Sequence, residues 1–206
     1  MTVFIRDNAR ILYVHVPKTG GTSIELFFEK NGFAVSFLDR GGKNSIVPMM
    51  KCSPQHLHAE ALRAIFHVNR FTYSFMTVRN PIDRLLSEYR MRAVMQTVIE
   101  DIDTWVATAL DSYSGNMFLI DNHIRPQVDF WFPDCDIFRQ EDGFGDAWVQ
   151  TIAQKTGCEF FDSKVDVAMR FDAALKVIPS PKSIARIREF YRRDFELFGY
   201  DSAVVA

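Results

Sequence analysis

Hydrophobic positions along the chain alternate between strand-like and helix-like patterns. Residues 11–16 form a nearly continuous run of apolar, β-branched and aromatic side chains that ends at Pro17. Such a run is typical of a buried strand in a parallel sheet. Apolar residues then recur at helical spacing between Ile24 and Phe28, ahead of Gly32. This pattern predicts a helix over about residues 22–31.

The same order of strand, loop and helix returns later in the chain. Residues 71–78 form an aromatic and β-branched run, and the segment after it places four apolar residues on one helical face. Asn80 is suited to the N-cap of this second helix, and Pro81 to its first position. The sequence therefore predicts two strand–loop–helix units.

The remaining pattern predicts shorter or less regular elements, and the strands again alternate with helices. The expected elements are a short strand at 33–38, a polar glycine-rich stretch at 40–45, helices at 59–66, 99–110 and 144–156, an irregular segment at 111–133, a short strand at 136–138, and a last helix from Ser180-Pro181 that carries Ile184, Ile187, Tyr191 and Phe195 inward. This alternation predicts an α/β fold with a parallel β-sheet flanked by helices, whose ligands bind beyond the carboxyl ends of the strands.

Composition narrows the class of protein. A chain of 206 residues with 48% hydrophobic residues is expected to form a single domain spanning 1–206. A formal net charge of -2 without long runs of one sign argues against a nucleic-acid partner. The sequence contains no stretch of about 18 apolar residues, so no integral membrane segment is expected. Together with three scattered cysteines, expected to be free thiols, this favours a cytoplasmic protein. Without a CxxC or HExxH motif, no metal site is expected.

The first strand–helix junction carries the sequence Pro17-Lys18-Thr19-Gly20-Gly21-Thr22-Ser23. Glycines allow backbone N–H groups to close around an anion, and the helix N-terminus adds a partial positive charge. The segment is not a Walker A loop, because Lys18 precedes the glycines instead of following them. The residues alone predict a cradle for a phosphate-like group.

This heptapeptide resembles the 5′-phosphosulfate-binding loop of the sulfotransferases. The resemblance implies a P-loop-type sheet and a co-substrate, 3′-phosphoadenosine 5′-phosphosulfate (PAPS), whose 5′ end is bound by Lys18, Thr19, Gly20, Gly21, Thr22 and Ser23. Residues 78–89 are similar to the family's 3′-phosphate-binding segment, which implies that Arg79 and Ser87 hold the 3′-phosphate. A guanidinium also suits this ligand chemically, because it presents a charge-assisted fork to a phosphate.

Three further stretches, 121–127, 138–142 and 190–200, are similar to the carbohydrate sulfotransferases and their bacterial relatives. The resemblance implies a glycan hydroxyl as the acceptor. Sulfuryl transfer is an in-line displacement in which positioning and charge stabilisation dominate, as in phosphoryl transfer. We expect Lys18 to stabilise charge on the bridging oxygen without a metal ion.

An acceptor hydroxyl also needs a general base, for which histidine is the usual choice. His56 and His58 lie where glycan sulfotransferases carry their catalytic histidine, and we favour His56 because His58 is expected on the first turn of a helix, facing solvent. His123 is the alternative base. His15 is expected to be a packed core residue, and His67 a cap or surface group.

Other polar residues near these motifs have two interpretations. Arg125 and Gln127, with His123, are candidates to contact the acceptor, although Arg125 precedes a proline and a fixed turn explains it equally well. Arg84 is spaced for an ion pair with Glu88, which favours a structural role. Two rival functions remain open, namely a nucleotide-dependent phosphotransferase and a non-catalytic nucleotide-binding module.

Overall fold

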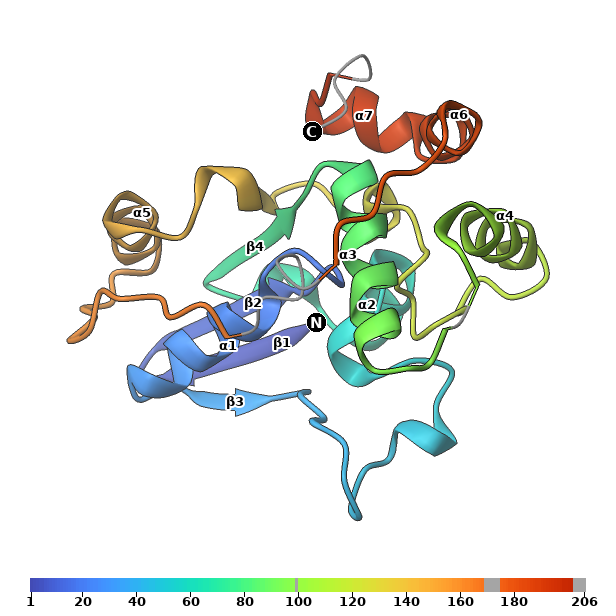
Figure 1. Ribbon diagram of the computed structural model, residues 1–206. Helices are drawn as coiled ribbons and strands as arrows, with labels where there is room; N and C mark the ends of the chain where they lie inside the picture. The colour runs from blue at the N-terminus through green and yellow to red at the C-terminus, as the bar shows by residue number, and fades with distance from the viewer. Residues whose placement is uncertain (99, 169–174, 202–206) are drawn as a thin grey trace.

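The computed structural model describes residues 1–98, 100–168 and 175–201, and its centre is one five-stranded sheet (Figure 1). The strand order is β3-β1-β2-β4-β5. The strands are β1 (Thr2–Arg6), β2 (Ala9–Val14), β3 (Ala34–Ser36), β4 (Tyr73–Val78) and β5 (Asp136–Arg139). Strands β2, β4 and β5 are parallel, whereas β1 runs antiparallel to both of its neighbours. The α/β prediction is confirmed, with a mixed sheet whose parallel part carries the two predicted junctions.

Strand β1 is the one element of the sheet that the apolar pattern did not predict. It forms a hairpin with β2 in which Arg6 pairs with Ala9, so that only Asp7 and Asn8 make the turn. Asp7 has a positive φ of 51°, as tight hairpin turns require. The pair Asp7-Asn8 lacks the glycine that marks most two-residue hairpin turns, so the sequence carried only a weak signal for this hairpin.

Seven helices flank the sheet in the described part of the chain. They are α1 (Gly21–Lys30), α2 (Ala59–Ile65), α3 (Pro81–Val94), α4 (Ile102–Tyr113), α5 (Asp146–Thr156), α6 (Pro181–Phe190) and α7 (Arg192–Phe198). Each predicted helix is present within a few residues. The last is divided at Tyr191, but the four residues expected to point inward are all buried. None of the described helices is long and apolar enough to cross a lipid bilayer.

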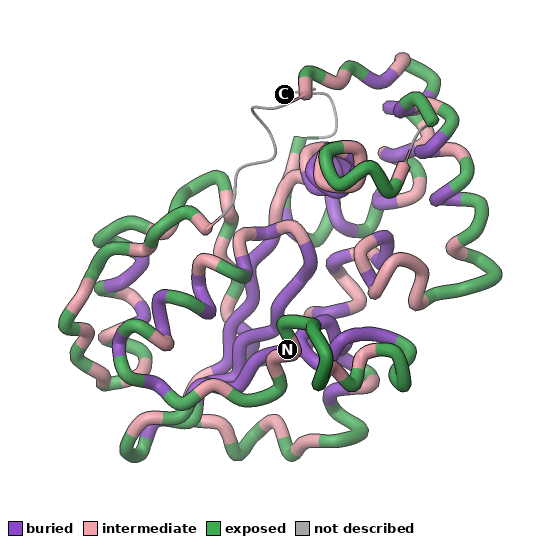
Figure 2. The backbone as a smooth tube through the Cα atoms, turned by 60° about the horizontal axis from the view of Figure 1, so that its bottom comes forward, coloured by how far each residue is buried: buried purple, intermediate pink, exposed green. Residues whose placement is uncertain are grey.

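The two faces of the sheet pack into different clusters because alternate side chains of a strand point to opposite sides. Leu12 and Val14 of β2 join a cluster with Leu62 of α2, whereas Ile11 and Tyr13 pack with residues of α1 and α5. A third cluster unites α3, α4, α6 and α7. Figure 2 shows the strands as the most continuously buried part of the backbone. The sheet therefore forms a rigid platform for the loops at its edge.

Candidate active site

The two predicted anion-binding junctions lie side by side. The loop after β2 enters α1, and the turn after β4 enters α3. Strands β2 and β4 are parallel neighbours, with Val14 opposite Met76, so both strands end at the same edge of the sheet. The loop at 17–23 and Arg79 therefore flank one region beyond the carboxyl ends of the strands, where open α/β sheets bind ligands.

A chain of hydroxyl groups fixes the 17–23 loop to the sheet. Thr19 Oγ1 donates to the carbonyl of Val16 at 2.7 Å, and it also contacts Thr77 Oγ1 of β4 at 2.7 Å. Thr77 Oγ1 in turn contacts the hydroxyl of Tyr13 at 2.7 Å. Since Thr19 is fully buried, its side chain acts within the protein by holding the loop to the sheet.

Glycines allow the loop to turn and to approach its neighbours closely. Gly20 has φ of 90° and Lys18 has φ of 69°, both in the left-handed region. A Cβ at Gly21 would lie 2.0 Å from His15 Nε2, so the imidazole occupies the space that any side chain there would need. The opposite ring nitrogen, His15 Nδ1, lies 2.8 Å from Glu25 Oε1. The prediction of a buried His15 is confirmed, and its imidazole packs against the loop at Gly21.

The second junction is held by its own helix cap and by a distant glutamine. Asn80 Oδ1 accepts from the backbone N–H of Ile82, which confirms Asn80 as the N-cap of α3. The side-chain amide of Gln127 bonds to Arg79 in both directions, accepting from its N–H at 2.9 Å and donating to its carbonyl at 2.7 Å. Ser87 is buried on α3. The turn that presents Arg79 is thus fixed from two sides.

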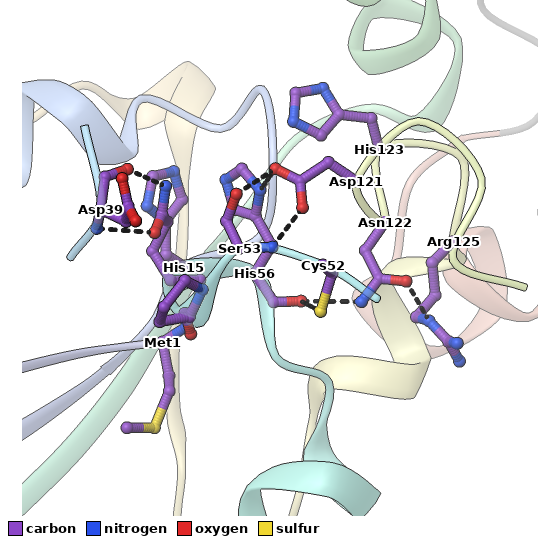
Figure 3. A network of polar contacts seen from close by, with 12 residues as sticks. Met1, His15, Asp39, Cys52, Ser53, His56, Asp121, Asn122, His123 and Arg125 are labelled. Carbon is purple, nitrogen blue, oxygen red and sulfur yellow. Dashed lines mark hydrogen bonds and ion pairs between the residues drawn. The ribbon is translucent and has the colours of Figure 1, made fainter. Parts of the chain in front are cut away.

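His56 and Asp121 form a histidine–carboxylate pair near this edge (Figure 3). His56 Nδ1 lies 2.8 Å from Asp121 Oδ2, and the N–H and hydroxyl of Ser53 also donate to the same carboxylate. Burial lowers the pKa of His56 to about 3, more than its contact with Asp121 raises it. The imidazole is therefore neutral at pH 7, with its proton on the nitrogen that faces Asp121.

His123 and Glu88 form a second pair of the same kind. His123 Nδ1 lies 2.6 Å from Glu88 Oε2, and Glu88 also accepts from Arg92. Burial alone would raise the pKa of Glu88, but His123, Arg92 and Lys18 together lower it to about 2. The His56 and His123 ring centroids are 4.9 Å apart. One site therefore contains two oriented imidazoles.

Lys18 extends from the loop toward α3. Its Nζ lies 3.1 Å from Met91 Sδ, and its charge acts on Glu88. Lys18 therefore lies near the pair formed by Glu88 and His123.

Two expectations about neighbouring residues are wrong. Arg84 does not pair with Glu88, because its buried guanidinium donates to the carbonyls of Pro17, His123 and Arg125, while Glu88 is engaged by His123 and Arg92. His58 does not face solvent, since it is buried at the N-cap of α2. The structural role favoured for Arg84 is confirmed, with a different set of partners.

Arg125 also has internal partners. The side chain is only 3% exposed, and it donates to Asn122 Oδ1, Asp129 Oδ2 and the carbonyl of Met117. Arg125 therefore braces the loop that carries Asp121 and His123.

Two further expectations concern residues outside this site. His67 is an exposed N-cap of a short helix, as expected. The three cysteines are free thiols, namely Cys52, Cys135 and Cys158.

Sequence reasoning assigned no role to Asp121, and it paired Glu88 with Arg84 instead of His123. Both residues lie inside motifs that were selected because of other residues. The histidine partner of Asp121 is 65 positions away in the chain, and that of Glu88 is 35 positions away. The only local signal was an acidic residue two positions before His123. Neither contact follows from helical or strand periodicity.

The fold and its two anion-binding junctions agree with a comparison against protein families. The model described as "Sulfotransferase family" matches residues 1–130, which is more than half of the chain. The chain belongs to the sulfotransferase family. The matched part of this sulfotransferase includes both junctions, His56, Asp121 and His123. A search of curated proteins and one of solved structures gave no match.

Proposed function

We propose that this sulfotransferase uses PAPS as its donor and transfers the sulfuryl group to a hydroxyl, that of a carbohydrate. The observation that carries the donor assignment is the pairing of the two junctions on adjacent parallel strands. The loop at 17–23 offers backbone donors and Lys18 to the 5′-phosphosulfate, and Arg79 with Ser87 offers a second anion site to the 3′-phosphate.

The proposed reaction is a single in-line displacement. His56 Nε2 takes the proton of the acceptor hydroxyl while Nδ1 remains hydrogen-bonded to Asp121. The acceptor oxygen bonds to sulfur as the bond from sulfur to the bridging oxygen breaks, and 3′-phosphoadenosine 5′-phosphate leaves. Lys18 stabilises the negative charge that develops on the bridging oxygen. No metal ion is required by this scheme.

The remaining candidates receive roles that follow from their contacts. Thr22 and Ser23 stand at the start of α1, where the backbone amide of Thr22 reinforces the 5′ site and that of Ser23 closes the turn by donating to the carbonyl of Gly20. Gln127 fixes the backbone of Arg79, and Arg125 fixes the loop of Asp121 and His123, so both act by positioning. His123 is the second base candidate, and His58 packs against Phe118, so it receives no direct role in the reaction.

The carbohydrate acceptor rests on the similarity of residues 121–127 and 190–200 to glycan sulfotransferases. A cytoplasmic location is also part of the proposal, supported by the three free thiols, since such thiols persist in a reducing compartment.

The proposal is tested by transfer of label from PAPS to a panel of glycans. We expect His56→Ala and Lys18→Ala to lower kcat by a factor of at least about 100, because each removes a group that acts in the transition state. The exposed His67→Ala serves as the matched control and should retain full turnover. Wild-type turnover in either active-site variant would overturn the assigned roles. Transfer from ATP in place of PAPS would favour a phosphotransferase, and binding without any transfer would favour a nucleotide-binding module.

A further inference from the structure

The cluster of His56, Asp121 and His123 has the composition of a metal site. One ligand atom from each of the three residues lies within 4.8 Å of the others. The three come from two segments about 65 residues apart, so no short sequence motif reports them. Imidazole with a carboxylate is a donor set that suits Zn²⁺ and similar transition-metal ions, whereas Mg²⁺ and Ca²⁺ prefer oxygen ligands alone.

The carboxylates orient both imidazoles as metal ligands are oriented. His56 Nδ1 is bonded to Asp121 and His123 Nδ1 to Glu88, at 2.8 Å and 2.6 Å. A proton on each Nδ1 leaves the lone pair on each Nε2. Metal-ligating histidines characteristically donate the other ring nitrogen to a carboxylate or a carbonyl, which fixes the tautomer and raises the basicity of the ligand.

The side chains around the cluster are held in place by burial and by hydrogen bonds. Glu88 is fully buried and His56 is 8% exposed, so neither side chain has room to adopt alternative rotamers freely. Asp121 is held by Ser53 through two hydrogen bonds. Two carboxylates next to the imidazoles favour a dication, and Arg92 and Lys18 together offset part of the charge of Glu88. The site therefore offers preformed ligands with a limited electrostatic penalty.

We propose that this cluster binds one divalent transition-metal ion of the Zn²⁺ class through His56 and His123, with the Asp121 carboxylate beside them and water completing the coordination. Because the bound ion occupies the lone pair of His56, it blocks proton transfer from the acceptor. This inhibitory effect rests on the proposed function, but binding itself does not. The ion leaves the loop at 17–23 and Arg79 unoccupied, so donor binding is unchanged.

Binding is measured by titrating the full chain with Zn²⁺ in competition with a chromophoric chelator. We expect one equivalent bound by the wild type, at least about 10-fold weaker binding in His123→Asn, and weaker binding in Glu88→Gln, which removes a carboxylate that orients a ligand. His67→Asn is the matched control and should bind like the wild type. Circular dichroism and affinity for 3′-phosphoadenosine 5′-phosphate verify that each variant is folded.

Equal Zn²⁺ affinity in wild type and His123→Asn, or no stoichiometric binding by the wild type, would overturn the metal site. In the activity assay, Zn²⁺ should inhibit competitively with the acceptor and leave donor affinity unchanged, with Mg²⁺ at the same concentration having no effect. Zn²⁺ bound at this site without loss of turnover would contradict the inhibitory role. A wild type that binds Zn²⁺ but transfers no sulfuryl group would reject the proposed function and retain the metal site.

Discussion

At the scale of single residues, three histidines each bond to a carboxylate, and two of them, His15 and His56, are buried while His123 is half-buried. Glu25 bonds to His15, Asp121 to His56, and Glu88 to His123. In each pair the carboxylate faces Nδ1, so the proposed proton transfer uses Nε2 of His56. The histidines were visible in the sequence, but their carboxylate partners were not, because contacts between distant segments leave no local pattern.

Replacing Asp121 by asparagine tests the orientation of His56. The amide keeps the size of the side chain but removes the charge that fixes the tautomer, so we expect kcat to fall by a factor of at least about 100 while donor affinity stays constant. Asp111→Asn, on an exposed part of α4, is the control. The double variant His56→Ala/Asp121→Asn should be no slower than His56→Ala alone, because both residues act as one unit. Additive losses would contradict this coupling.

Gly21→Ala tests the close packing of the loop against His15. The added Cβ would lie 2.0 Å from His15 Nε2, so either the loop or the imidazole must move. We expect a loss of about 1–3 kcal/mol in the free energy of unfolding and weaker donor binding. Gly115→Ala is matched, since its Cβ would make ordinary contact 3.7 Å from the nearest atom. Urea unfolding and calorimetry measure both effects, and equal behaviour of the two variants would contradict the packing argument.

At the scale of elements, the sequence correctly predicted features that depend on interactions between residues close together in the chain, such as the start of a helix. Asn80 and Pro81 start α3 as expected because a cap and a proline act within one turn of helix. The last helix is divided at Tyr191 although its apolar pattern is continuous, and this division was not predicted. Periodicity reports which face is buried, but it does not locate a change in helix direction that tertiary packing imposes.

Alanine variants at two helix caps distinguish an effect on stability from an effect on donor binding. Asn80 caps α3 next to Arg79, and Asp101 caps α4 by accepting from the N–H groups of Asp103 and Thr104. Replacing either residue by alanine should lower the free energy of unfolding by about 1 kcal/mol. Only Asn80→Ala should also weaken binding of 3′-phosphoadenosine 5′-phosphate, because its cap fixes the turn that presents Arg79. Equal donor affinities in the two variants would argue against this role of the turn.

At the scale of the whole molecule, hydrogen bonds connect helix α7 to the proposed nucleotide site. Asp194 of α7 accepts from the backbone N–H groups of Gln127 and Val128, and Gln127 bonds to the backbone of Arg79. The family match ends at residue 130, but α7 supports a residue inside the matched part. The helices beyond the match therefore help to shape the site.

Asp194→Ala tests this connection. Loss of the carboxylate leaves two buried N–H groups without their acceptor, so we expect the free energy of unfolding to fall by about 2–4 kcal/mol and donor affinity to decrease. Glu196→Gln, on the exposed side of α7, should change neither quantity. Chemical unfolding and calorimetry are the measurements. Donor affinity equal to that of the wild type in folded Asp194→Ala would show that the C-terminal helices do not influence the site.

One calorimetric comparison tests whether the two adjacent junctions form the proposed two-ended clamp for a nucleotide with a 3′-phosphate. Wild type and Arg79→Ala are titrated with 3′-phosphoadenosine 5′-phosphate and with 5′-AMP, which lacks only the 3′-phosphate. We expect the wild type to bind the bisphosphate more tightly than 5′-AMP, and Arg79→Ala to lose about 10–100-fold in affinity for the bisphosphate alone, because it removes a charge-assisted contact. Equal affinity of the wild type for both nucleotides, or tight ATP binding that Arg79→Ala leaves unchanged, would contradict it.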